Sequence, residues 1–473
     1  MFEVRYLDIA LPSRWPGYQI KKGNHHIHSG LNLLRNGQFN EGFYQLRAGL
    51  ARAPSNRDGR LALAQLYAIS KRPDLAQSTL LQGLEYHQGD PEYVARVLGF
   101  LLSKSEDQMT VTLCDQLLRK PDTNQNLVEI EALSAAMACF YRGNYDRAEN
   151  YLSHYKLDHT QAGRLLIAQL EWERGYRDLA LLLLRDLNHE FPGDEEVYAK
   201  YSEYLSDVGQ TEEIRHLAVI YQIAHPDSPR SHLDQLGSEL QEKNPTDFRK
   251  AAQGVLAEFM DDPVGLLAIG DFAATHGLVD LIRDIQGLFQ QHEWEGTMAV
   301  RLMGIEALLV SKRYVEALLD IQVFLKEPGL ETQLLNVATG LQAIAQYGVG
   351  DPVTAYTSLT ALVAQPNLRT ESLLAIANRL IVMEYPAPAR LVLTKAMELN
   401  PQNQAVLSRL IEMDIEAKNT TSLMANVPRL LTMRKPSPAL LADVHHLLRS
   451  DAYMFLPQRN QLLDSVAGAM SRH

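Results

Sequence analysis

The sequence contains few cysteines, few aromatic residues and no long apolar runs. Cys114 and Cys139 are the only cysteines among 473 residues, too few for a disulfide framework or for a structural zinc site built on cysteines, and we expect both to be buried in helices. Aromatic residues make up 7% of the chain, and runs of β-branched residues bounded by turn residues are scarce. This leaves little material for a sheet. Helix should therefore prevail throughout.

Basic residues are also fewer than acidic residues. The chain has 45 Lys and Arg against 57 Asp and Glu, a formal net charge of −12. This balance argues against a nucleic-acid partner, because binding phosphates requires a concentrated basic surface. Residues 1–60 are the exception, with nine basic and four acidic residues and hence a local charge of +5.

The first 22 residues lack the apolar core of a signal peptide. Pro12, Pro16 and Gly17 should interrupt any helix, so we expect an extended N-terminal arm over residues 1–22. No stretch of ~18 apolar residues is present, which predicts a soluble, cytoplasmic protein. The alternative is a membrane-tethered or periplasmic domain whose N-terminal anchor has been removed, with the basic N-terminal end close to lipid.

A helix–turn–helix unit recurs along the chain. Its clearest copy, residues 30–56, has an apolar-periodic helix, a turn at Asn36 and Gly37, a second amphipathic helix and a stop at Pro54. The turn and second helix recur at 142–155, 174–194, 311–329, 350–367 and 386–403.

The spacing of these copies resembles that of the tetratricopeptide repeat family. Pro192 and Pro226 lie 34 residues apart, as do the turn glycines Gly175 and Gly209, and 34 residues is the period of that family. The resemblance covers about residues 23–435.

Small residues should let the helices of each unit approach closely, and large apolar residues should fill the space between units. The small residues are Gly30, Ala64, Ala136, Ala168, Gly270, Ala343 and Ala377 on first helices, and Gly42, Ala76, Ala148, Ala180, Ala317, Ala355 and Ala389 on second helices. The large ones are Leu46, Leu80, Leu152, Leu184, Leu359 and Leu393. We also expect the aromatic side chains just past the turns, Phe39, Tyr145 and Tyr314, to wedge between the two helices.

The resemblance therefore implies an all-α, right-handed superhelical solenoid of about twelve antiparallel helix pairs. We expect two repeat arrays, residues 23–227 and 228–435, followed by capping helices over 436–473. Three stretches fit the repeat less well: 91–125 lacks the turn glycine, 228–263 has a looser turn, and 405–435 is degenerate.

No residue pattern indicates catalysis, a cofactor or a metal. His25, His26 and His28 lack the i, i+4 spacing of helical metal ligands, and His292 lacks the second histidine of a zinc-protease motif. The glycines near 348–350 are not followed by the Lys-Ser or Lys-Thr of a phosphate loop. The repeats also leave no room for a separate catalytic domain. We therefore expect a protein that is not an enzyme.

In the tetratricopeptide family the first helices line a concave face that holds peptides or helices. Carried over to this chain, the candidate partner-binding groove consists of Gln65, Met137, Phe140, Tyr141, Gln169, Trp172, Glu173, Glu203 and Asp207. Aromatic and methionine anchors beside amide and acidic groups suit a peptide groove. The alternative is that Phe140 and Trp172 pack between repeats and that the acidic residues form a solvated face.

The predicted function is a non-enzymatic scaffold or adaptor that binds a protein segment, in a setting such as a bacterial envelope or a multi-subunit assembly. The acidic groove favours a basic or neutral partner. The alternative is a regulatory or sensor array that binds a short peptide or small ligand.

Overall fold

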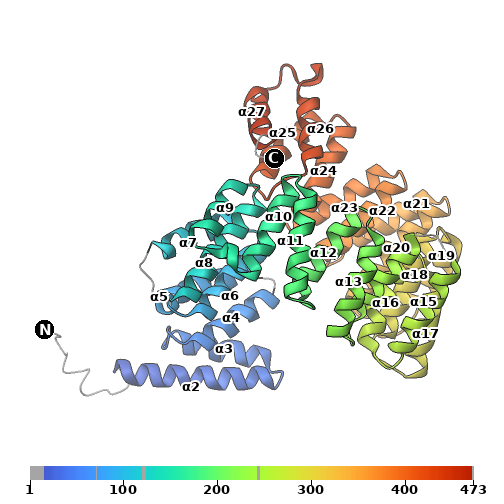
Figure 1. Ribbon diagram of the computed structural model, residues 1–473. Helices are drawn as coiled ribbons and strands as arrows, with labels where there is room; N and C mark the ends of the chain where they lie inside the picture. Colours follow the sequence, from blue (N-terminus) through green and yellow to red (C-terminus); the bar gives the residue numbers. More distant parts are fainter. Residues whose placement is uncertain (1–14, 71, 120–123, 242–244, 471–473) are drawn as a thin grey trace. The chain divides into compact units, whose positions relative to one another are not determined.

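The computed structural model describes residues 15–70, 72–119, 124–241 and 245–470. Every regular element within these ranges is a helix, and they contain no strand. Contacts divide the chain into two compact units, Met1–Leu170 and Glu171–His473. We call them unit 1 and unit 2 and describe each by itself (Figure 1).

Unit 1 consists of consecutive helices joined by short turns, and the boundary between the units falls within its last helix. The elements are α2 (Pro16–Arg35), α3 (Phe39–Leu50), α4 (Arg57–Ile69), α5 (Pro73–His87), α6 (Pro91–Ser103), α7 (Asp107–Leu118), α8 (Gln125–Tyr141), α9 (Tyr145–His154), the 3-10 helix η2 (Leu157–His159) and α10 (Gln161–Glu173).

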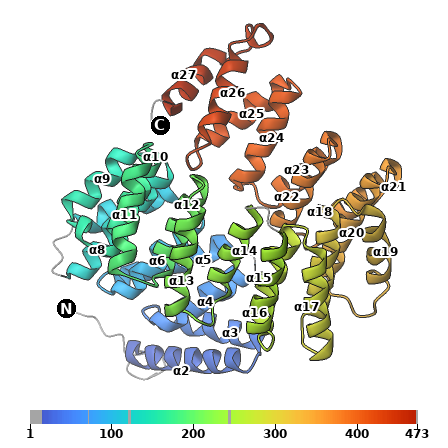
Figure 2. The ribbon, with the colours of Figure 1, turned by 45° about the vertical axis from the view of Figure 1, so that its right-hand side comes forward.

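Unit 2 continues the same arrangement. Its elements are α11 (Arg177–Glu190), α12 (Glu195–Asp207), α13 (Thr211–Ala224), α14 (Pro229–Gln241), α15 (Pro245–Glu258), α16 (Pro263–Thr275), α17 (Val279–Gln291), α18 (Thr297–Val310), α19 (Tyr314–Phe324), α20 (Thr332–Gly348), α21 (Pro352–Val363), α22 (Thr370–Val382), α23 (Pro386–Leu399), α24 (Gln404–Glu416), α25 (Thr420–Leu431), α26 (Pro438–Leu448), η3 (Asp451–Tyr453) and α27 (Arg459–Met470). Figure 2 shows the helices from α12 to α21 following one another in chain order.

Among the described residues, α2 to α25 are 24 successive helices, the number that twelve helix pairs require, and α26 and α27 follow them. The predicted all-α array of about twelve pairs is thus confirmed. The last helices share an apolar cluster with α24 and α25 that includes Leu407, Val427, Leu441 and Tyr453. They therefore cover the end of the array, as expected of a cap.

The predicted small residues are buried, and they set the distance between helices. At Gly42 an added Cβ would lie 2.7 Å from Leu34 Cδ2, and at Gly30 it would lie 3.1 Å from the Gly42 carbonyl oxygen. Only the absence of a side chain permits this approach of α2 and α3. The large apolar residues are also buried: Leu46, Leu184 and Leu359 have no exposed surface.

The turns within the pairs use the left-handed backbone region. Gly175 and Gly209 have φ values of +87° and +75°, which glycine adopts without strain. In the stretch 91–125, which lacks the turn glycine, Ser105 takes the same conformation with φ of +58°. The repeat geometry is therefore retained there despite the missing glycine.

Two expectations about the N-terminal region were wrong. The extended arm expected over residues 1–22 is helical from Pro16 onward, because proline is favourable in the first helical turn and the Trp15 carbonyl accepts a hydrogen bond from Gln19 N–H at 3.0 Å. The rest of that arm, residues 1–14, lies outside the described residues. Phe39 does not wedge its hairpin, since it is 59% exposed, whereas Tyr145 is buried as expected. The side chain that packs against Gly42, between α2 and α3, is that of Leu34.

The expected division of the array near residue 227 stays a prediction. In the part of the chain that the structure describes, no helix is both long enough and apolar enough to cross a bilayer.

Candidate protein-binding surface

The candidate groove residues of unit 1 are largely structural. Gln65 is exposed on α4, but Met137 and Phe140 on α8 pack against the apolar core of unit 1. The ring of Phe140 lies 5.9 Å from that of the buried Tyr145. Tyr141 and Gln169 are partly buried. Among the five candidate residues of unit 1, therefore, Gln65 alone is exposed.

The candidate residues of unit 2 lie together around one aromatic pair. Trp172, at the end of α10, stacks on Tyr204 of α12 with ring centroids 4.0 Å apart and an interplanar angle of 8°. The guanidinium of Arg177 lies 5.3 Å from the Trp172 ring, and the Lys200 ammonium lies 5.9 Å from the Tyr204 ring. Trp172 thus packs between α10 and α12, the first helices of successive pairs, and it is only partly exposed.

Three carboxylates surround this pair. Glu203 and Asp207 are one turn apart on α12 and both are exposed, and Glu173 follows Trp172 on α10. Burial raises the pKa of the Tyr204 phenol, and the negative charges of Glu203, Glu173 and Asp207 raise it further. The structure therefore brings these three predicted residues together.

Two of the three carboxylates are already engaged. Glu203 accepts a hydrogen bond from Lys200 Nζ at 2.6 Å, and Glu173 accepts one from Lys435 Nζ at 2.8 Å. Asp207 has no ion pair among the described residues, and Glu203 remains exposed beside its lysine. Glu203 and Asp207 are thus the two carboxylates best placed to meet a partner's positive charge.

The surrounding stretch is strongly acidic. Residues 171–227 contain thirteen Asp and Glu and five Lys and Arg, so their net charge of 5 − 13 = −8 accounts for two thirds of the −12 of the whole chain. We call residues 171–227, which include α11, α12 and α13, the acidic stretch. Such a concentration of one sign attracts cations and basic segments.

The acidic stretch also exposes apolar side chains, which sequence reasoning missed. Leu179 and Leu182 are exposed on α11, and Val219 and Ile223 are exposed on α13. The two helices are linked by Arg185 Nη2 on α11, which lies 3.4 Å from Glu213 Oε1 on α13. These residues lie on α11 and α13, whereas the predicted groove was assigned to the first helices. Their i, i+3 and i, i+4 spacing was the signal available in the sequence.

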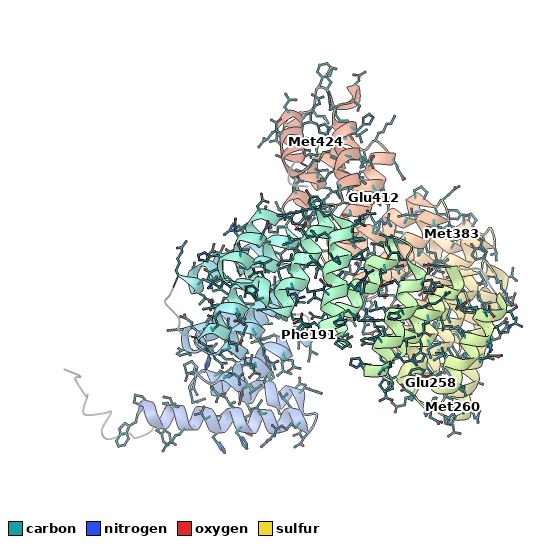
Figure 3. The ribbon with its side chains drawn as sticks, in the orientation of Figure 1. Phe191, Glu258, Met260, Met383, Glu412 and Met424 are labelled. Atoms are coloured by element: carbon teal, nitrogen blue, oxygen red, sulfur yellow. The ribbon has the colours of Figure 1, made fainter. Side chains whose placement is uncertain are left out.

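The chain turns sharply between α11 and α12, and this turn is fixed by α13. Phe191 marks the end of α11 (Figure 3). His225 Nε2, directly after α13, lies 2.6 Å from the Gly193 carbonyl oxygen. The relative positions of α11 and α13 are therefore held at this end by a side chain as well as by packing.

A second concave feature lies elsewhere in unit 2. A groove of about 950 Å³ is lined by Phe248, Ala252 and Leu256 of α15, by Leu281 and Asp284 of α17, and by neighbouring turn residues. Its lining combines apolar side chains with a few charged ones, which is typical of ligand pockets.

Metal-ligating side chains do not gather in the described parts of the chain. No cluster of three or more His, Cys, Asp or Glu that could hold a metal ion occurs there. Both cysteines are buried, as predicted. Burial raises the pKa of Cys139 to about 11 and raises that of Cys114 as well. Neither thiol is therefore a ready nucleophile at neutral pH.

Comparisons with known proteins bear on the fold. A family model described as "Tetratricopeptide repeat" matches residues 33–98, from the end of α2 into α6. No curated protein matches the sequence.

Several solved structures match the chain over most of its length. They include Naa15/Naa10 bound to HypK-THB (15% identity, covering 97% of this chain and 70% of that one, TM-score 0.32). A second is the APC/C hetero-tetramer Cut9-Hcn1 (14% identity, 95% and 86%, TM-score 0.32). A third is the P58(IPK) TPR domain (13% identity, 87% and 98%, TM-score 0.23).

Proposed function

We propose that this chain, a helical repeat protein of the tetratricopeptide type, is a non-enzymatic scaffold that holds a segment of another protein. The observation that carries the proposal is the cluster of exposed carboxylates beside the stacked pair of Trp172 and Tyr204 in the acidic stretch. Stable protein interfaces combine apolar anchors with charged groups that guide and orient the partner. A catalytic site would instead require a nucleophile, an acid–base pair or a metal centre.

The partner's chemistry follows from the charge. A net charge of −8 over 57 residues, those from 171 to 227, attracts a basic segment and repels an acidic one. Glu203 and Asp207 supply this negative charge on a first helix, and the partly exposed Trp172 beside them supplies an apolar contact. We therefore propose a basic segment that carries an apolar side chain as the partner.

The test is a double charge reversal, Glu203→Lys with Asp207→Lys, in the full-length chain. Affinity capture from the source cell followed by mass spectrometry identifies a stoichiometric partner of the wild-type chain. We expect the double variant to bind that partner about tenfold more weakly at low salt, since each reversed surface charge is worth ~1 kcal/mol or less. Its thermal stability should be nearly unchanged, because both side chains are exposed.

A matched control reverses two exposed acidic residues on first helices outside the acidic stretch, Asp271→Lys on α16 and Glu371→Lys on α22. This control should bind the partner like the wild type. Equal loss in both double variants would indicate a general charge effect, and retained binding by the Glu203 and Asp207 variant would refute the proposed surface.

A second candidate function is a sensor that binds a short peptide or small ligand. The groove between α15 and α17 favours it, because its volume of about 950 Å³ suits a ligand of that size. Recovery of a small ligand with the purified chain, in the absence of a stoichiometric protein, would support this candidate against the scaffold.

A further inference from the structure

We propose that the first turns of α2, residues 15–22, dock on the surface of an anionic lipid bilayer. These turns lack cover from α3. Helix α2 has 20 residues and is about 30 Å long, whereas α3 has 12 residues and is about 18 Å long. The two helices are in contact at Gly23, whose added Cβ would lie 2.8 Å from Ala53, just past the end of α3. Residues 16–22 therefore extend beyond α3 (Figure 1).

The extension presents aromatic side chains to solvent. Trp15, Tyr18 and Ile20 are 51%, 46% and 44% exposed. Trp15, Tyr18 and Lys22 follow the i, i+3, i+7 spacing of one helical face. The face that packs on α3 is a different one, marked by the buried Gly23, Ile27 and Gly30. The aromatic face is thus outside the hairpin's own core.

The charge of α2 suits an anionic surface. None of its 20 residues is Asp or Glu, although the chain as a whole carries a net charge of −12. Lys21 and Lys22 are exposed, and neither forms an ion pair within the described ranges. A lysine near an anionic membrane strengthens binding by about fivefold, so the pair contributes about 25-fold.

The combination favours lipid over protein or nucleic acid. Trp and Tyr prefer the level of the lipid headgroups, where the ring is in an apolar layer and its polar atom stays hydrated. Two adjacent lysines then reach the phosphates. Two aromatic rings and two lysines form too small a basic surface for nucleic acid, which requires several phosphate contacts. The contact proposed is a helix end lying on the bilayer, since no described helix could cross it.

The test uses the full-length chain and vesicles of phosphatidylcholine with or without phosphatidylserine. We expect the chain to sediment with the mixed vesicles, to sediment little with phosphatidylcholine alone, and to be released by salt. Trp15 is the exposed tryptophan, because Trp172 stacks on Tyr204 and Trp294 lies against His292. Its fluorescence should therefore shift to the blue on binding, and Trp15→Phe should abolish most of that shift.

The variant Lys21→Glu with Lys22→Glu should lose at least 25-fold in vesicle affinity. Arg35→Glu, an exposed charge reversal at the other end of α2, is the matched control for charge. Tyr44→Ala, an exposed aromatic residue on α3, is the control for Tyr18→Ala. Both controls should bind like the wild type.

Three results would overturn the proposal: no sedimentation with anionic vesicles, equal weakening by Arg35→Glu, or an unchanged Trp15 spectrum on binding. Loss of a captured protein in the lysine variant, without any vesicle binding by the wild type, would assign the helix end to a protein partner instead. The first three results leave the proposed scaffold function unaffected, because its test relies on Glu203 and Asp207.

Discussion

The close contact of α2 and α3 at Gly23 predicts a large difference between two similar substitutions. An alanine Cβ at position 23 would lie 2.8 Å from Ala53 Cβ, 2.8 Å from Ala53 N and 2.9 Å from the Gly49 carbonyl oxygen. Two of these three atoms belong to the backbone and cannot rotate away. Restoring a contact of 3.4 Å requires the helices to separate by 3.4 − 2.8 = 0.6 Å. We expect this overpacking to cost ~1–3 kcal/mol.

Gly17→Ala provides the comparison within the same helix. No heavy atom lies within 4 Å of a Cβ at that position, so the substitution adds helix propensity and no clash. Each Gly→Ala change gains up to ~1 kcal/mol of propensity in a helix. That gain is smaller at Gly17, in the first turn of α2, than at Gly23 in the helix interior. The difference in stability between Gly23→Ala and Gly17→Ala is therefore a lower limit on the packing cost.

Hydrogen exchange measured by mass spectrometry is the appropriate assay, because a terminal repeat can open without unfolding the rest of an array. Amides of α2 should exchange about 5- to 150-fold faster in Gly23→Ala than in Gly17→Ala, the ratio that corresponds to ~1–3 kcal/mol. Peptides from α22 and α23 in unit 2 should exchange at unchanged rates. Equal protection of α2 in both variants would refute the close packing of α2 on α3.

Two further predictions concern a turn and a buried phenol. Lys312 has a φ of +59°, the left-handed conformation that glycine takes in other turns. The substitution Lys312→Gly should therefore stabilise the chain by about 1 kcal/mol, whereas Lys312→Ala should not. The midpoints of urea denaturation of the two variants test this prediction. Burial raises the pKa of the Tyr93 phenol from 10.0 to about 12. The free energy of unfolding that depends on the neutral phenol is therefore fully present below pH 10, and it is lost as the pH rises through about 12. Denaturation midpoints measured across that range should fall less steeply for Tyr93→Phe than for the wild type.

Most of the fold could be predicted because the repeat places small residues, turn residues and prolines at fixed spacing. Ala76, Ala148 and Ala180 are all fully buried where close approach of helices was expected. The stretch 91–125 was harder, since its turn lacks glycine, yet packing forces Ser105 into the same backbone conformation. The helical start of α2 was missed because Pro16 and Gly17 were interpreted as helix breakers, although proline is tolerated in a first turn.

The candidate site could be predicted only in part. Exposed polar residues such as Glu203 and Asp207 could be placed from the repeat, because an acidic side chain on a first helix rarely packs inside. The positions of aromatic residues could not be predicted in this way, because the same helical spacing is found on faces that pack in the core and on faces that bind a partner. Phe140 packs inward, and Trp172 stacks on Tyr204, which lies 32 residues further along the chain. Whether these two rings meet depends on how closely successive repeats pack, and the periodicity of residues within one helix does not determine that distance.

The charge distribution has a consequence for how the two proposed contacts combine. The acidic stretch, with a net charge of −8, is repelled by an anionic bilayer, whereas α2 carries no acidic residue and is attracted to it. A basic partner prefers the acidic stretch and is in turn repelled by α2. Membrane and partner should therefore not compete for one surface, and binding of one should leave the affinity for the other nearly unchanged. If vesicles instead displaced the captured partner from the wild-type chain, the two contacts would share residues, and the separation of partners by charge would be refuted.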